Sequence, residues 1–454
     1  MYTYGTKPPQ PRPADFPYHA GQSFRIRRHL APPPFGYKYK VAKGLRQITN
    51  YWLEPLKSQQ LTPLERCLRH PPQERPPDEY EEDEDGNNNG VKDGKKDVEE
   101  KDDAEDNKND VKDGKNDYDA SFYLNDMDKV YTLHIVDEIV ARAGHGAQIL
   151  RCRIDGFGSD GNGSDEPKYV AKIYDAAYYK VFDGNDDDDD CFDGDVSFEA
   201  DREYSTEVAA YEQLYREDAN GRYTPAYYAS WTFDMPVPQV EGCDRPATRP
   251  VRLIVMEYLA GTDMYKLMVK GAVDTIPVPR RLELMAEMME CQCQIEFLGV
   301  THVDLEPRNV LVLESALNQD IVTDPNDVAV FIIDFGRSYV LDSYWMKDLS
   351  WRPRLPKVRN PILRYWNHTL QEFGPWIPYI YHMRWPAFNG WLQHRWADSA
   401  EKYAVPTPFE REHYGLDDET EYIPPESISL PETRIPGKIV RSLDPDFMKR
   451  FAYN

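Results

Sequence analysis

The stretch His302-Val303-Asp304-Leu305-Glu306-Pro307-Arg308-Asn309 connects a long predicted helix to a short predicted strand. A carboxylate placed on such a loop can face an open cleft and act on a substrate proton. A second short apolar stretch, residues 328–333, leads into Asp334-Phe335-Gly336. These two stretches thus carry a candidate base, Asp304, and two further side chains with oxygen atoms, Asn309 and Asp334.

Upstream of these motifs, the apolar residues alternate as they do in β-strands. The first two predicted strands flank a turn at Gly144–Gly146 and form a hairpin. Lys172 lies in the middle of the third predicted strand, within the apolar run Val170-Ala171-Lys172-Ile173. The predicted strands occupy residues 133–141, 149–152, 169–174, 226–233, 251–258 and 310–313.

Two segments have the periodicity of amphipathic helices. In residues 203–215, Val208 and Tyr211 share one side, and the carboxylate of Glu207 lies opposite these packing residues. In residues 281–298, apolar residues recur at steps of four and three, which gives the clearest helix prediction of the chain. A shorter helix-like patch, residues 61–68, lies in a Pro-rich and aromatic-rich N-terminal region whose role we cannot assign.

The order of these elements resembles the eukaryotic-like protein kinase superfamily over about residues 131–340. This resemblance implies an α+β, bilobal protein-kinase-like fold, with a β-rich N-lobe, a helical C-lobe, and ATP and Mg²⁺ as cofactors. The overall sequence pattern of the chain is also similar to that of divergent fungal kinase-like proteins. We find no acceptable Ala-Pro-Glu motif after Gly336, because Pro424-Pro425-Glu426 lies too near the C-terminus for a large helical subdomain to follow.

The resemblance assigns three catalytic residues. Asp304 is expected to be the catalytic base, and Lys172 to steady the α- and β-phosphates of ATP. Glu207 is expected to pair with Lys172, with Glu203 and Glu212 as competitors for that role. Asn309 and Asp334 are expected to bind Mg²⁺.

The remaining nucleotide contacts fall on a hairpin turn and on a strand end. Gly144, Gly146 and Ile149 are expected at the phosphate-covering loop. The two glycines are equally typical of a simple hairpin turn. Met256 is expected to be the gatekeeper beside adenine, and the backbone of Glu257 and Leu259 to contact it. An ordinary buried strand explains residues 253–261 about as well.

Two departures from the resemblance bear on function. Val303 replaces the arginine that reads a phosphorylated activation loop, so we do not expect that form of control. Glu306 replaces a lysine near the γ-phosphate, where an acid would repel the transferring group, and Arg308 is a candidate to compensate. Similar loops occur in small-molecule kinases, so the hydroxyl acceptor is either a protein or a small molecule.

The charge of the chain is unevenly distributed. Its 454 residues include 54 Lys and Arg against 79 Asp and Glu, which gives a formal net charge of −25. Residues 78–119 hold 19 acidic residues and 7 lysines, and residues 183–195 hold 8 acidic residues without a base. We expect both stretches to be disordered and expect neither nucleic-acid nor membrane binding. Scattered cysteines and the lack of an apolar leader favour the cytoplasm, with the nucleus left open.

These observations divide the chain into an N-terminal extension (1–75), a disordered acidic linker (76–120), an N-lobe (121–260, with the insertion 183–195) and a C-lobe (261–454). The leading hypothesis is an ATP-dependent phosphotransferase that moves a γ-phosphoryl group to a hydroxyl. The alternative is a pseudokinase scaffold that binds nucleotide or protein partners without catalysis. An interaction protein of unrelated α+β fold would require the ordered motifs to be accidental.

Overall fold

The structure is a computed structural model. It describes residues 13, 15–36, 38–40, 42–45, 61–76, 127–144, 146–157, 168–179, 196–239, 244, 246–317, 329–341, 343, 346, 356–368 and 370–428. The two acidic stretches predicted to be disordered, residues 78–119 and 183–195, lie outside the described residues.

Six antiparallel strands form a closed barrel with the order β1-β2-β3-β4-β6-β5. Alternating apolar side chains fill the barrel, because successive residues of a strand point to opposite faces of the sheet. Five of these strands lie where the alternation predicts strands. The barrel strands are β1 (Ser23–Arg28), β2 (Val130–Val140), β3 (Gln148–Ile154), β4 (Tyr169–Tyr174), β5 (Tyr227–Pro236) and β6 (Thr248–Glu257).

The first strand comes from the N-terminal region to which the sequence assigned no role. In β1, Ser23 lies opposite His134 of β2, and Arg28 lies opposite Trp231 of β5. This strand therefore joins the two ends of the sheet. The β-rich part of the protein thus includes residues before position 121, where the predicted N-lobe begins.

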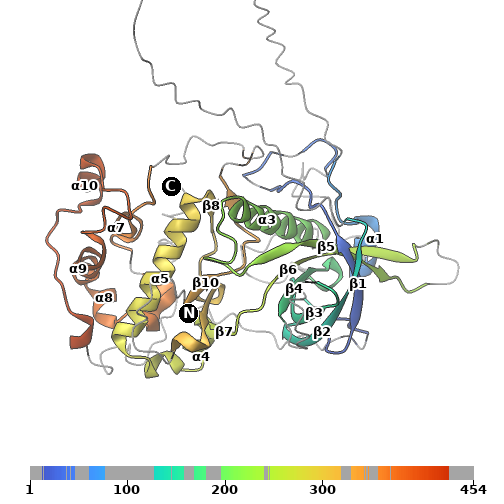
Figure 1. Cartoon of the computed structure of the whole chain (residues 1–454), viewed down its shortest axis with the longest axis horizontal. Coiled ribbons are helices and arrows are strands. Elements are labelled where there is room, and N and C mark those ends of the chain that lie inside the picture. The colour runs from blue at the N-terminus through green and yellow to red at the C-terminus, as the bar shows by residue number, and fades with distance from the viewer. Residues whose placement is uncertain are drawn as a thin grey trace, which may run out of the picture.

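One long helix, α3 (Val196–Arg216), packs against β4, β5 and β6 and carries Glu207. It begins before the predicted residue 203, since Val196, Phe198 and Ala200 also pack inward. In Figure 1, α3 (green) runs between the barrel and α5 (Val278–Phe297), the helix predicted over residues 281–298. The α3 helix therefore links the β-rich part to the helical part.

Short helices and small sheets make up the rest. Figure 1 shows the barrel at one end of the molecule, α7–α10 at the other, and α5 between them. The short helices are α1 (Pro63–Arg69), α4 (Met264–Val269), α6 (Glu314–Leu317), α7 (Pro361–Tyr365), α8 (Tyr379–Met383), α9 (Trp385–Trp396) and α10 (Pro408–Tyr414). The 3₁₀ turns are η2 (Ala176–Tyr178), η3 (Ala272–Thr275), η4 (Pro307–Asn309), η5 (Gln371–Trp376) and η6 (Pro425–Ser427). The small-sheet strands are β7 (Gly261–Asp263), β8 (Val300–Thr301), β9 (Val310–Leu313), β10 (Val330–Ile332) and β11 (Tyr339–Val340).

The buried apolar residues form two large clusters. One cluster joins the barrel to α3, and the other surrounds α5 and the C-terminal helices. Four C-terminal tryptophans are buried in the second cluster, as expected of large indoles, whereas the side chain of Trp385 is exposed. The buried four are Trp366, Trp376, Trp391 and Trp396. Among the described helices, none combines the length and the apolar character that crossing a membrane requires.

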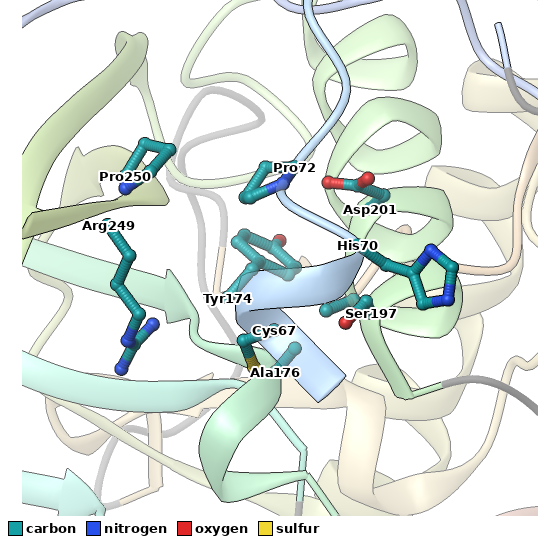
Figure 2. A pocket seen from close by; sticks show the side chains of 10 residues that line it. Cys67, His70, Pro72, Tyr174, Ala176, Ser197, Asp201, Arg249 and Pro250 are labelled. Carbon is teal, nitrogen blue, oxygen red and sulfur yellow. The ribbon is translucent and has the colours of Figure 1, made fainter. Parts of the chain in front are cut away.

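A small cavity lies beside α1, which contacts η2 and α3. Figure 2 shows Cys67 of α1 beside Tyr174 of β4 and Arg249 of β6. Arg249 binds the buried carboxylate of Asp175 through two hydrogen bonds of 2.7 Å, and Tyr18 donates a third of 2.5 Å. Three segments distant in sequence are therefore held together by one buried acid, whose charge is paired and hydrogen-bonded.

Candidate active site

Lys172 is the centre of the site. It lies in β4, all of whose residues are buried, and its Nζ donates to Oε2 of Glu207 over 2.5 Å and to Oδ1 of Asp334 over 2.7 Å. Burial lowers the pKa of the ammonium group, but the charges of Asp334 and Glu207 outweigh burial and raise the pKa above its usual value. The site therefore holds a buried cation between two carboxylates.

Glu207 is the acid on α3 that contacts Lys172. Its side chain is fully buried and also accepts a hydrogen bond of 2.6 Å from the hydroxyl of Tyr174. Burial raises the pKa of Glu207 despite the nearby ammonium group. Glu203 instead accepts from Tyr179 over 2.9 Å, and burial together with the charge of Asp334 raises its pKa to about 7.

Asp334 follows β10 in a left-handed backbone conformation, with φ of 69°. Non-glycine residues adopt this conformation infrequently, and Asp tolerates it better than most. Burial of the neighbouring Phe335, which packs edge-on against His302 and Tyr211, holds this turn in place. The surrounding protein acts to raise the pKa of Asp334, but the ammonium group of Lys172 more than offsets that effect, so the pKa is lowered. Its side chain is 48% exposed, which leaves the carboxylate open to a ligand.

Hydrogen bonds join the 302–309 loop to the segment before Asp334. His302 Nε2 lies 3.0 Å from the carbonyl of Ile333, and the Ile333 amide donates to the carbonyl of Asn309 over 2.9 Å. Asn309 Nδ2 donates to the Asp304 carbonyl over 2.7 Å. The structure thus brings Asp304, Asn309 and Asp334 to one region, next to Lys172.

Arg308 lies between two acids of this loop. Its guanidinium donates to both carboxylate oxygens of Asp304, at 3.0 and 3.1 Å, and forms an ion pair with Glu306. Burial raises the pKa of Glu306, and Arg308 opposes that rise. The negative charge that the sequence places at Glu306 is therefore partnered by Arg308.

The donor set near Asp334 suits a hard cation that arrives with phosphate. Because Asn309 uses its Nδ2 on Asp304, its Oδ1 remains the atom for a cation, alongside the Asp334 carboxylate. In the part of the chain that the structure describes, no three His, Cys, Asp or Glu side chains form a group that could hold a metal. Mg²⁺ commonly binds through one or two carboxylates plus substrate phosphates, so Asn309 and Asp334 fit that mode.

The predicted adenine contacts lie at the end of β6. Met256 is buried, lies opposite Val170 of β4, and receives a contact of 3.8 Å from the Tyr211 hydroxyl to its sulfur. The amide of Glu257 donates to Ala226 over 2.8 Å. The amide of Leu259 forms no backbone hydrogen bond with any described residue. Of these two amides, that of Leu259 is therefore the candidate donor to a ligand.

Hydrogen bonds hold the predicted phosphate loop against the rest of the protein. Gly144 and Gly146 have φ of 72° and 124°, values that glycine adopts without steric cost. The Gln148 side chain accepts from the Arg142 amide over 2.7 Å and donates to the carbonyls of Arg142 and Gly146. The Gly144 amide donates to Tyr178. Two loop amides therefore already have protein partners. Ile149 lies opposite Lys172 in the pairing of β3 with β4.

The sequence reasoning missed the two tyrosines that bind the acids on α3. Tyr174 lies two residues after Lys172 in the same strand, so both side chains point to the same face. That spacing could have placed the Tyr174 hydroxyl beside Glu207. Tyr179 follows the strand in η2 and its turn, where no periodicity indicates its direction.

Comparisons with known proteins give a short sequence match and a structural match to kinases. No model of a known protein family matches the chain. Over 68 residues it is 31% identical to the serine/threonine-protein kinase PknG of Mycobacterium leprae, a match that covers 15% of this chain and 9% of that protein. The crystal structure of the PF14_0431 kinase domain aligns with a TM-score of 0.29 and 14% identity, covering 47% of this chain and 52% of that one. The short sequence match suggests a kinase-like chain, and the structural match adds no weight at that score.

Proposed function

We propose that the protein is an ATP-dependent phosphotransferase that moves a γ-phosphoryl group to a hydroxyl of a protein or small-molecule acceptor. The observation that carries this proposal is the position of Lys172, buried between Glu207 and Asp334. Phosphoryl transfer requires fixed positive charge near the phosphates and oxygen ligands for a metal ion. These groups come from β4, α3 and the segment after β10, which supports the proposal that the nucleotide binds between two lobes.

Each residue has a role in this proposal. Lys172 would bind the α- and β-phosphates while Glu207 keeps its ammonium group in place. Asn309 and Asp334 would hold Mg²⁺, which supplies charge neutralisation for the phosphates. Met256, Glu257 and Leu259 would surround adenine, and the Leu259 amide is available as a donor.

Asp304 would orient the acceptor hydroxyl and receive its proton. Arg308 holds both carboxylate oxygens of Asp304 in the structure, so an acceptor must displace one of these hydrogen bonds or approach beside it. The same guanidinium would lie near the transferred group and offset the charge of Glu306. This arrangement supports a positioning and charge-neutralising mechanism.

The test combines nucleotide binding with turnover. Asp304→Ala should abolish ATP consumption and leave Mg²⁺-ATP binding intact, because Asp304 contacts the acceptor rather than the nucleotide. Lys172→Met should weaken both. Asp398→Ala removes an exposed aspartate after α9 and serves as the matched control, with wild-type behaviour expected. Equal ATP consumption by wild type and Asp304→Ala would reject the catalytic role.

A scaffold that binds nucleotide without transferring phosphate is the second candidate. It is favoured by the phosphate loop, because the Arg142 and Gly144 amides are used within the protein. A melting temperature raised by Mg²⁺-ATP, without release or transfer of γ-labelled phosphate to a broad set of acceptors, would favour this candidate.

A further inference from the structure

A segment of the N-terminal region crosses from the barrel to the candidate site. We call it the strap: residues 29–36, 38–40 and 42–45. It begins directly after β1, where His29 Nδ1 lies 2.7 Å from the hydroxyl of Tyr204 on α3. Further along, the ring of Phe35 packs edge-on against Phe198 of α3, with centroids 5.0 Å apart. The strap therefore contacts the helix that carries Glu207 at two points.

The strap then reaches the segment that follows Asp334. Tyr39 is 1% exposed, and its hydroxyl donates to the carbonyl of Ser338 over 3.3 Å and accepts from the amide of Val340 over 2.8 Å. One side chain thus satisfies two buried backbone groups of residues 338–340. Leaving such groups without a partner is unfavourable, so this contact fixes the segment.

Short connections lead from Tyr39 to the acids of the site. The Ser338 amide donates to the carbonyl of Phe335 over 3.0 Å, and Phe335 is bonded directly to Asp334. On the other side, Phe198 and Glu207 belong to the same helix, which also contacts β11. A single segment therefore holds both elements whose carboxylates meet at Lys172.

We propose that Tyr39 is a positioning residue, and that its hydroxyl fixes residues 338–340 against α3 so that Asp334 and Glu207 meet at Lys172. The consequence for nucleotide binding rests on the proposed function, whereas the positioning of the two carboxylates does not. The strap thus makes the geometry of the site depend on residues before position 46.

Tyr39→Phe tests this proposal, since it removes the hydroxyl and keeps the ring. We expect amide hydrogen exchange of residues 338–340 to accelerate about tenfold, which corresponds to ~1.4 kcal/mol. Tyr381→Phe is the matched control. Its hydroxyl donates to the carbonyl of Ile423 over 2.7 Å from an equally buried ring in the helical part. The control should leave exchange of residues 338–340 unchanged.

A second measurement reports on the ion pairs that Lys172 forms with Glu207 and Asp334. Acylation of Lys172 by an amine reagent, followed by mass spectrometry, should be several-fold faster in Tyr39→Phe than in wild type or Tyr381→Phe. Unchanged exchange of residues 338–340, or unchanged Lys172 acylation, would overturn the proposal. Phe35→Leu, which loosens the strap on α3 instead, should also accelerate Lys172 acylation if Tyr39→Phe folds poorly.

Nucleotide affinity separates this proposal from the proposed function. If wild type binds Mg²⁺-ATP, Tyr39→Phe should bind it about tenfold more weakly, and an unchanged affinity would overturn the link from Tyr39 to the site. If wild type binds no Mg²⁺-ATP, the proposed function fails, while faster Lys172 acylation in Tyr39→Phe still supports the positioning role.

Discussion

The ammonium group of Lys172 lies 2.7 Å from the carboxylate of Asp334, a residue 162 positions further along the chain. Lys172 belongs to the barrel, and Asp334 follows β10, a strand of a separate three-stranded sheet. This ion pair therefore joins the barrel to the segment that follows a second sheet. Since Mg²⁺ would bind the same carboxylate in the proposed function, it would compete with Lys172 for Asp334.

Replacing Lys172 should cost stability as well as nucleotide binding. Lys172→Met leaves the Glu207 carboxylate buried without its cation, which should lower the free energy of unfolding by about 3–5 kcal/mol. Urea denaturation measures this loss. Adding Glu207→Gln should recover part of the stability and none of the Mg²⁺-ATP affinity. Full recovery of affinity in the double variant would contradict the role proposed for Lys172.

Glu203 should contribute a loss of stability as pH rises from about 4.5 to about 7. Its pKa is raised to about 7 in the folded state, so this carboxyl group binds more protons in the folded protein than in the unfolded chain across this range. Glu203→Gln mimics the protonated form. We expect the variant to become more stable than wild type by about 1–2 kcal/mol at pH 8, and to match it near pH 4.5.

Urea denaturation at several pH values measures this dependence. Glu287→Gln is a useful comparison, because burial also raises the pKa of Glu287 to about 7, and Glu287 lies on α5. Each substitution should remove part of the loss of unfolding free energy that accompanies the rise in pH, and the double variant should remove more of it. A Glu203→Gln variant whose unfolding free energy depends on pH as that of wild type does would show that Glu203 titrates normally.

Asp334→Asn should remove the effect of Mg²⁺ on nucleotide binding. The amide keeps the shape of the side chain but loses the charge that a hard cation requires. Calorimetric titration with ATP should therefore give similar affinities with and without Mg²⁺ for the variant, whereas Mg²⁺ should increase the wild-type affinity about tenfold or more. A Mg²⁺ effect of wild-type size in Asp334→Asn would place the metal elsewhere.

Gly390 should resist substitution. A Cβ atom there would lie 2.9 Å from the backbone nitrogen of Tyr422 and 2.5 Å from the carbonyl carbon of Glu421. Backbone atoms cannot turn aside as a side chain can, so Gly390→Ala should destabilise the protein by about 1–3 kcal/mol. Gly374→Ala is the control, because a Cβ there meets nothing within 4 Å. Equal melting temperatures for both variants would contradict the close contact of α9 with residues 421–422.

Local sequence patterns predicted several elements. The helix over residues 281–298 has clear periodicity, the strand over residues 169–174 is a short apolar run, and both occur in the structure. Lys172 and Glu207 could be paired from the order of the motifs. Lys172 lies on the predicted strand over residues 169–174, and Glu207 lies on the predicted helix over residues 203–215. The structure also selects Glu207 over Glu203 and Glu212 as the partner of Lys172, a choice that depends on helix rotation and not on spacing alone.

The contacts of the N-terminal region could not be predicted in the same way. In β1, Phe24 and Ile26 alternate with Arg25 and Arg27, which is a usable strand signal. Its partners, however, lie more than a hundred residues away, and no local pattern identifies them. Tyr39 has no periodic neighbours at all, so its contacts with Ser338 and Val340 follow only from tertiary packing.

The closure of the barrel by β1 has a consequence for biosynthesis. During translation, β1 leaves the ribosome first, yet its two neighbours in the barrel are β2 and β5, and β6 must enter between β4 and β5. The barrel therefore cannot close until residue 257 has emerged. Such distant pairings slow folding, and the unpaired edges of the nascent strands make the growing polypeptide prone to aggregation until the barrel closes.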